Sequence, residues 1–161
     1  MALTLREVVP WWLLAAAITV LDQITKVIAD TQLLLHKAVP VVPFFNLTLM
    51  YNEGAAFSFL ADEAGWQRWF FIVLSSAVSI ALAVWLTRIK PQEKWLAIGL
   101  SLVLGGAIGN LIDRIVYGHV VDFIQVYYQQ WYWPTFNVAD SAISVGAAVL
   151  IITSLFSRQE A

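Results

Sequence analysis

The sequence predicts a mainly α-helical membrane protein, a four-transmembrane-helix bundle that carries a small β-hairpin on one side. Hydrophobic residues make up 60% of the 161 residues and charged residues only 12%. The mean hydropathy of +0.75 lies well above that of ordinary soluble domains. The apolar residues also gather into four segments, each long enough to cross the hydrocarbon core of a bilayer. We therefore interpret residues 1–161 as a single integral membrane domain.

The four predicted spans cover residues 10–29, 69–87, 95–114 and 140–157. The first begins at Pro10, a residue suited to the first turn of a helix. Its roughly 20 residues, at about 1.5 Å each, match a hydrocarbon core of ~30 Å. The second and third spans contain long stretches without charge, and the fourth is apolar after its first residue.

Basic residues beside the spans predict the orientation of the chain. Arg6 precedes the first span and Arg158 follows the fourth. The link between the second and third spans contains Arg88, Lys90 and Lys94. All of them fall on one side if four spans alternate, and the positive-inside rule makes that side the cytoplasm. Lys37 and Arg68 lie on the opposite side and are outnumbered. We expect both termini to be cytoplasmic and segments 30–68 and 115–139 to lie on the outer side.

The outer segment 30–68 carries a strand-like pattern. Polar and apolar residues partly alternate over 45–51, residues 52–54 have turn chemistry, and residues 56–59 suit a returning strand. These features predict a short β-hairpin resting on the membrane. Segment 115–139 is dense in tyrosine, tryptophan and phenylalanine, which is typical of an aromatic belt among lipid headgroups.

Composition excludes several kinds of partner and site. A net charge of −2 and the lack of a basic cluster predict that the protein binds no nucleic acid. The sequence has no cysteine, so it has no disulfide, thiol nucleophile or cysteine metal site. Neither a His-Glu-x-x-His nor a Gly-x-Ser-x-Gly motif is present. We expect no metal and no cofactor.

Counting along the predicted helices brings ionisable side chains from separate spans to one level. Lys94 and Asp113 are about 19 residues apart, or roughly 28 Å at the helical rise. Arg158 and Asp140 are about 18 residues apart, or roughly 27 Å. The two charges of the first span lie in its outer half. Four stretches therefore deliver polar groups to one outer layer.

Charges inside a bilayer need partners or a function, because each costs about 2.5–3.5 kcal/mol at its centre. Asp22 and Lys26 lie four residues apart and hence on one face of the first helix. Asp113 and Arg114 are adjacent at the end of the third span. One alternative for these four residues is local pairing that only holds the helices together.

Asp122 and Asp140 are the candidate catalytic pair, since neither has a cation beside it in sequence. Two carboxylates held close cannot both ionise easily. One is then free to take a proton from water while the other, protonated, polarises a carbonyl group. This division of labour hydrolyses a peptide without a metal or a covalent intermediate. Helix capping is a further role for Asp140, which precedes an apolar run.

Two other functions fit a small polytopic protein. A proton channel or solute transporter would use the clustered charges to line a path. However, the polar residues gather at one side and the second span contains no charge, so a continuous path is missing. A non-catalytic adaptor would present segment 30–68 to partners, and the two aspartates would then be replaceable.

Five sequence blocks, in this order along nearly the whole chain, resemble the bacterial lipoprotein signal peptidase family, also called signal peptidase II. They are Leu21–Lys26, Tyr51–Ser58, Gly106–Arg114, Val120–Phe123 and Phe136–Ser141. The resemblance implies four transmembrane helices with a small periplasmic β-cradle, in the bacterial cytoplasmic (inner) membrane. It also implies an aspartic endopeptidase that removes the signal peptide of prolipoproteins immediately before the diacylglyceryl-modified cysteine.

The resemblance also assigns roles by position. The catalytic dyad falls on Asp122 and Asp140, near the periplasmic face. Substrate-binding or dyad-supporting positions are Asn52, Gly54, Asn110, Arg114 and Asn137, and structural polar positions are Asp22, Lys26 and Asp113. Among the former, an amide or guanidinium either binds a peptide carbonyl or orients the aspartates. We expect the diacylglyceryl-modified prolipoprotein and membrane lipid as partners, and a monomer as the working form.

Overall fold

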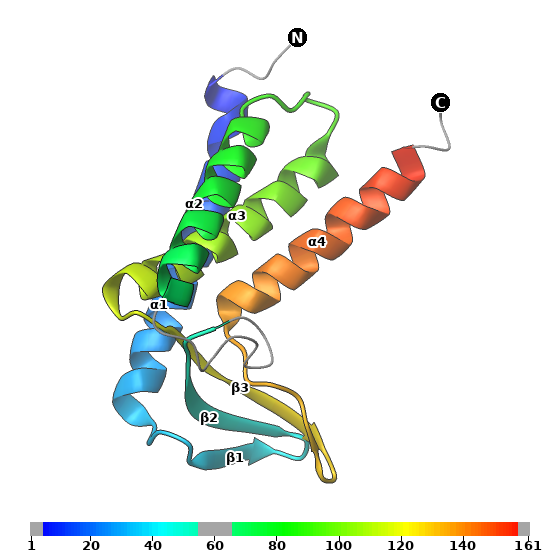
Figure 1. Cartoon of the computed structure of the whole chain (residues 1–161). Coiled ribbons are helices and arrows are strands. Elements are labelled where there is room, and N and C mark those ends of the chain that lie inside the picture. Colours follow the sequence, from blue (N-terminus) through cyan, green and yellow to red (C-terminus); the bar gives the residue numbers. More distant parts are fainter. Residues whose placement is uncertain (1–4, 55–65, 158–161) are drawn as a thin grey trace.

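Four long helices dominate the structure, a computed structural model that describes residues 5–54 and 66–157 (Figure 1). They are α1 (Leu5–Gln32), α2 (Trp66–Leu86), α3 (Lys94–Val116) and α4 (Val138–Ser157). All 4 are long and apolar enough to cross a membrane. The four-helix fold class expected from the composition is confirmed.

The first helix starts earlier than the sequence pattern indicates. α1 begins at Leu5, so Pro10 lies inside the helix rather than in its first turn. Proline lacks a backbone N–H, so position 10 gives up one bond to the turn before it. The predicted start at Pro10 is therefore five residues late, because the helix includes charged residues that an apolar pattern does not detect.

A small antiparallel sheet lies at one end of the helices, opposite the start of α1 and the end of α4 (Figure 1). Its strands are β1 (Ala38–Val42), β2 (Phe45–Asn52), β3 (Val120–Tyr128) and β4 (Trp131–Tyr132), in the order β1-β2-β3-β4. In the β2–β3 pairing, Met50 lies opposite Asp122 and Asn52 opposite Val120. The sheet thus brings the residues around position 52 beside one candidate aspartate.

The sheet differs from the predicted hairpin in its pairing. β2 is present, but its neighbours among the described residues are β1 and β3. The predicted return strand 56–59 lies outside the described residues. Segment 115–139, expected only as an aromatic belt, contains β3 and β4. The first four residues of β3 are all buried, so they do not show the polar and apolar alternation by which a half-exposed strand is found.

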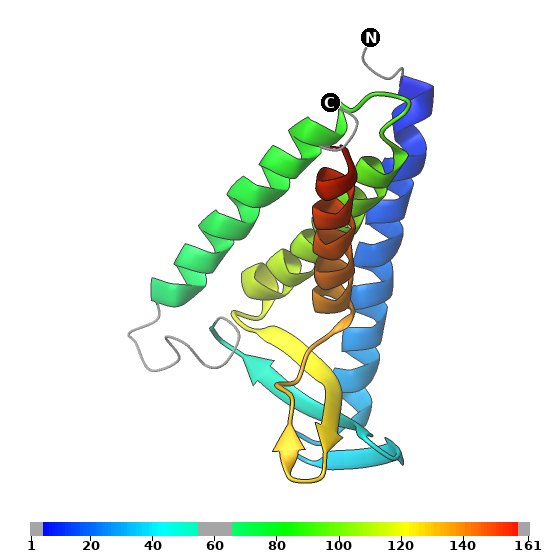
Figure 2. The same cartoon turned by 90° about the vertical axis from the view of Figure 1, so that its right-hand side faces the viewer.

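α3 is the central helix of the bundle and packs against the other three. In the most apolar 18-residue stretch of α3, 50% of the residues are buried inside the protein, compared with 11% in the corresponding stretch of α2. In Figure 2 the Trp66 end of α2 stands apart from the other helices, whereas the Leu86 end packs in a hydrophobic cluster with Ala15 of α1 and Leu100 of α3. Glycines on α3 allow close packing: a Cβ on Gly105 would lie 2.6 Å from the carbonyl oxygen of Ala15.

The outward faces of the helices are apolar and exposed. Leu13 on α1, Val73 on α2 and Ile151 on α4 are 64%, 66% and 61% exposed. Monomeric soluble proteins rarely expose apolar patches of this extent, and a lipid environment removes the cost. Most of the buried polar residues gather instead near the sheet, with Ser79 on α2 and Ser101 on α3 as exceptions.

Candidate active site

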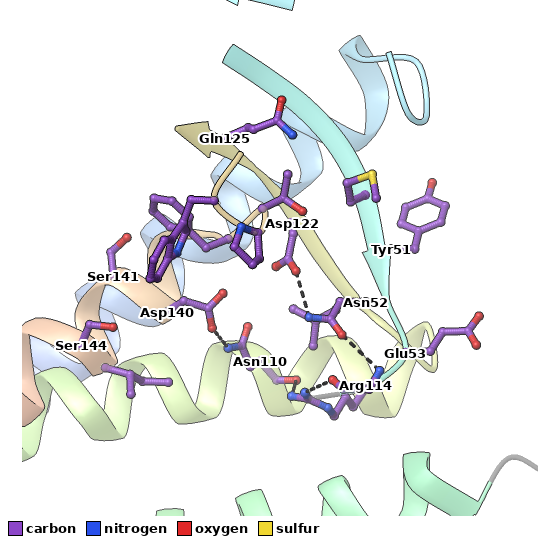
Figure 3. A pocket seen from close by; sticks show the side chains of 18 of the residues that line it. Tyr51, Asn52, Glu53, Asn110, Arg114, Asp122, Gln125, Asp140, Ser141 and Ser144 are labelled. Carbon is purple, nitrogen blue, oxygen red and sulfur yellow. Dashed lines mark hydrogen bonds between the residues drawn. The ribbon is translucent and has the colours of Figure 1, made fainter. Parts of the chain in front are cut away.

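An open cleft of about 1060 Å³ lies where α3 and α4 approach the sheet (Figure 3). Asp122 on β3 and Asp140 on α4 line it, and both carboxyl groups point into it. α3 contributes Asn110 and Arg114 to the same wall. The two candidate aspartates, from elements distant in sequence, therefore share one cavity.

Asp122 is a buried carboxyl group held by two amides. Its side chain is 2% exposed. Oδ1 accepts a hydrogen bond of 2.7 Å from Asn137 Nδ2, and Oδ2 accepts one of 3.1 Å from Asn52 Nδ2. Burial, and secondly the negative charge of Asp140, raise the pKa of Asp122 to about 7, against the lowering effect of these two hydrogen bonds. At neutral pH this group therefore holds a proton for much of the time.

Asp140 takes part in a capping box at the start of α4. The N–H of Asn137 donates to Asp140 Oδ2 at 3.2 Å, and the N–H of Asp140 donates to Asn137 Oδ1 at 2.8 Å. Such reciprocal bonds satisfy backbone donors that a helix start leaves free. The other oxygen, Oδ1, accepts from Asn110 Nδ2 at 2.8 Å. The capping role expected of Asp140 is confirmed, and its carboxylate still lines the cleft.

Asn137 connects the two aspartates. It is fully buried, at 0% exposure, and so lies behind the cleft. Its Nδ2 has Asp122 Oδ1, Asn110 Oδ1 and the Val121 carbonyl oxygen as acceptors within 3.3 Å, while its Oδ1 accepts from the N–H of Asp140. Of the two roles left open for Asn137, this geometry favours orienting the aspartates over binding substrate.

A buried lysine organises the polar groups beneath the cleft. Lys26 is 2% exposed, and its Nζ lies 2.8 Å from each of three acceptors: Asp22 Oδ2, Asp113 Oδ2 and Asn110 Oδ1. An ammonium group has three hydrogens to donate, so all are used. The pairing of Asp22 with Lys26 is confirmed. The pairing of Asp113 with Arg114 is wrong, because Asp113 faces across to α1.

The carboxylates of Asp22 and Asp113 in this network also accept hydrogen bonds from backbone N–H groups. Asp22 Oδ1 accepts the N–H of Ala139 at 2.8 Å, and Asp113 Oδ2 accepts the N–H of Val121 at 3.1 Å. Ala139 and Val121 are the residues immediately before the two candidate aspartates. One lysine-centred network therefore sets the backbone positions of both.

Gln23 belongs to this network, although sequence reasoning did not single it out. Its Nε2 donates to Asp113 Oδ1 at 2.8 Å and to the Gly109 carbonyl at 3.1 Å. Gln23 precedes Lys26 by three residues, so both lie on one face of α1. That spacing was a signal by which it could have been found.

Arg114 places a cation on the wall of the cleft. Its Nη1 lies 3.3 Å from the carbonyl oxygen of Asn110, and its Nη2 3.5 Å from that of Gly54. The guanidinium interacts electrostatically with Asp140, Asp122 and Asp113. Gly54 is held in turn by Asn52, whose Oδ1 accepts the Gly54 N–H at 3.1 Å. Asn52 thus links β2, Asp122 and the arginine.

Such an arrangement suits acid–base hydrolysis of an amide bond. Two carboxyl groups face one cavity, one of them has a raised pKa, and a guanidinium lies beside them. Within residues 5–54 and 66–157, no three histidine, aspartate or glutamate side chains are grouped as a metal ion would need.

A family model described as Signal peptidase (SPase) II matches residues 14–156. The chain belongs to the signal peptidase II family. The lipoprotein signal peptidase of Pseudomonas aeruginosa is 53% identical over 152 residues, covering 93% of this chain and 90% of that protein. The lipoprotein signal peptidase of Teredinibacter turnerae is 51% identical over 152 residues, covering 94% and 90%.

Solved structures agree with the family membership. One described as a bacterial membrane enzyme matches with a TM-score of 0.84 at 32% identity, covering 94% of this chain and 90% of that one. A second with the same description matches at 0.79 and 31%, covering 91% and 92%. The family resemblance is confirmed.

As a signal peptidase II family member the protein is a protease and thus a hydrolase, and its family acts on lipoprotein precursors. Membership and the four apolar helices indicate a multi-pass protein of the bacterial inner membrane. The transporter alternative is not favoured.

Proposed function

We propose that this signal peptidase II family member is an aspartic endopeptidase that works at the membrane surface. It removes the signal peptide of prolipoproteins immediately before the diacylglyceryl-modified cysteine, with water activated by Asp122 and Asp140. The observation that carries the proposal is the placement of these two carboxyl groups in one cleft. Both accept hydrogen bonds from Asn137, Asp122 from its side-chain Nδ2 and Asp140 from its backbone N–H.

The two aspartates divide the proton transfers between them. Asp122, whose pKa is raised to about 7, starts protonated and donates to the carbonyl oxygen of the scissile peptide. Asp140 starts as the anion and takes a proton from the water that attacks the carbonyl carbon. When the C–N bond breaks, Asp140 gives that proton to the leaving amine and Asp122 recovers one from the hydroxyl of the collapsing intermediate.

Neighbouring side chains bind the peptide and keep the aspartates in place. Arg114 lines the cleft and its cation suits a peptide carbonyl oxygen. Asn52, Asn110 and Asn137 each donate to one of the two aspartates and so orient them. All the residues named come from one chain, in keeping with a protein that works as a monomer.

The sheet end of the bundle faces the periplasm and both chain ends face the cytoplasm. Aromatic residues at the turn between β3 and β4 then reach the lipid headgroups, where Trp131 is 82% exposed and Tyr128 63%. The scissile bond of a lipid-modified precursor lies at that level, while the acyl chains stay in the bilayer.

Loss of cleavage on removing either carboxylate tests the proposal. The protein is reconstituted with a diacylglyceryl-modified prolipoprotein, and wild type is compared with Asp122→Asn and Asp140→Asn. Glu93→Gln, at a carboxylate between α2 and α3 that does not line the cleft, is the matched control. We expect each dyad variant to lose about 10²–10⁴-fold in rate while the control stays active. Cleavage that persists in both dyad variants would remove the dyad from the mechanism.

Topology is tested separately by thiol labelling, because the chain has no cysteine of its own. Single variants Val41→Cys on β1 and Gln92→Cys between α2 and α3 report the two sides. A membrane-impermeant maleimide added to spheroplasts is expected to label position 41 and to spare position 92 until the membrane is opened. The reverse pattern would invert the assigned orientation.

A further inference from the structure

α2 contributes none of the described residues that line the cleft, yet it holds the end of α3 that does. Arg68 Nε donates to the carbonyl oxygen of Arg114 at 3.0 Å, and Arg68 Nη2 donates to that of Ile115 at 2.9 Å. The last carbonyl groups of a helix lack intrahelical partners and form the negative end of its dipole. A guanidinium from α2 therefore completes the C-terminal end of α3.

Arg68 also packs against the turn that follows α3. Gly118 has a positive φ of 83°, and a Cβ placed there would lie 3.5 Å from Arg68 Nη1 and 3.6 Å from Arg68 Cζ. The turn leads directly into β3, which starts at Val120 and carries Asp122. One arginine thus contacts both the helix that carries Arg114 and the turn before Asp122.

Phe71, one helical turn further along α2 than Arg68, contacts the side chain of Arg114. The Cζ atom of Arg114 lies 5.1 Å from the centroid of the Phe71 ring, within cation–π range. On its other side the Arg114 guanidinium reaches the carbonyl oxygens of Asn110 and Gly54 at the cleft. The ring therefore limits where the guanidinium can move.

We propose that Arg68 and Phe71, here named the α2 clamp, are positioning residues for the peptidase reaction. Arg68 fixes the backbone of Arg114 and Phe71 fixes its guanidinium, so the cation is held where a substrate carbonyl arrives. The clamp acts through Arg114 and touches neither substrate nor the aspartates. This inference rests on the proposed function, because it assigns the clamp to that same cleft.

A clamp that acts through Arg114 differs in its kinetics from a contact that only joins two helices. Once Arg114 has lost its side chain, the clamp has nothing left to position, so removing it has no further effect on catalysis. A purely structural contact instead lowers activity by the same factor whether or not Arg114 is intact. A double-mutant cycle separates the two because coupled residues are not additive.

The experiment uses the full chain in lipid with the diacylglyceryl-modified prolipoprotein. Initial rates for Arg68→Ala, Phe71→Leu and Arg114→Ala, and for each clamp variant combined with Arg114→Ala, are divided by the amount of folded protein. We expect each clamp variant to lower kcat/KM by roughly 5- to 30-fold in the wild-type background and by less than about twofold in the Arg114→Ala background. We also expect the clamp variants to divide their loss between kcat and KM in the same ratio as Arg114→Ala does.

Conservative and matched variants guard against simple misfolding. Phe71→Tyr keeps an aromatic face and Arg68→Lys keeps a cationic hydrogen-bond donor, so both variants are expected to recover part of the lost rate. Phe156→Leu, the same change at an exposed ring on α4, and Arg88→Ala, the same change beyond the other end of α2, are expected to keep wild-type kinetics.

Losses that are the same with and without the Arg114 side chain would overturn the inference. An equal loss of rate in Phe156→Leu would also overturn it. Failure of the proposed function has a different signature, since it shows as cleavage by Asp122→Asn and Asp140→Asn whatever the clamp variants do.

Discussion

Replacing Asp122 by asparagine is expected to reverse the order of stability between acid and mildly alkaline pH. In the folded protein the pKa of Asp122 is raised from 3.8 to about 7, chiefly by burial. Between these two values the folded state binds more protons than the unfolded chain, so wild-type stability falls as pH rises through that window. At 1.36 kcal/mol per pH unit, the full penalty of the buried anion is roughly 4 kcal/mol above pH 7.

Asparagine removes this penalty but loses a hydrogen bond. Both oxygens of Asp122 accept from amide nitrogens, those of Asn52 and Asn137. Whichever way an asparagine amide is turned, its NH₂ meets one of these donors, at a cost of about 1–3 kcal/mol. We therefore expect Asp122→Asn to be less stable than wild type near pH 4.5 and more stable, by about 1–3 kcal/mol, at pH 8.

Thermal unfolding in detergent across pH 4.5–8.5 measures this difference. For a chain of this size about 1 kcal/mol corresponds to ~2–4 °C in Tm, so the two melting curves are expected to cross with a separation of several degrees at each extreme. Glu93→Gln, at a carboxylate away from the cleft, controls for the loss of one negative charge. Melting temperatures that stay parallel, or a variant that melts below wild type at every pH, would refute the raised pKa of Asp122.

Three further outcomes follow from the packing and the polar network. Asp22→Asn removes the negative charge that pairs with the buried Lys26, and breaking a buried ion pair costs about 3–5 kcal/mol of stability. We therefore expect this variant to lower Tm more than it lowers turnover per folded molecule. A larger effect on turnover than on Tm would place Asp22 in the reaction. Gly106→Ala should lower both Tm and activity more than Gly99→Ala. At Gly106 the added methyl group meets the Ala139 carbonyl oxygen first, whereas at Gly99 it meets the movable Leu150 side chain and the backbone oxygen of Gly146 is 3.1 Å away. Equal effects would contradict the closer backbone approach of α4 at Gly106. EDTA should leave the cleavage rate unchanged, and inhibition that added Zn²⁺ reverses would contradict a reaction without metal.

Hydropathy was sufficient to predict the helices, because a span needs about 20 apolar residues and few other structures allow that pattern. Asp22 and Lys26 were predicted as a pair because a spacing of four residues is local to one helix. The partner of Asp113 was missed for the opposite reason. Asp113 reaches Lys26 on α1, and nothing in the local sequence reports which helix lies opposite.

The sheet was harder to predict than the helices. β2 pairs with β3 although about 70 residues separate Asn52 from Asp122 in the chain, and its register includes a shift between Leu47 and Met50. Such pairing depends on tertiary contacts, since a strand buried on both faces loses its alternating pattern. Arg68 was equally hidden, because its partners are backbone carbonyl groups, which carry no signal in the sequence.

The several hydrogen bonds made by the Asn137 side chain have a consequence for inhibitors. Its amide serves both aspartates and starts α4 at the same time, so a replacement would have to restore several bonds at once. Resistance that arises by single substitutions is therefore expected at the rim of the cleft, at residues such as Gln125 and Ser144, and not at this asparagine. Compounds that place their contacts deep, against Asp122 and Asp140, leave the enzyme the fewest routes of escape.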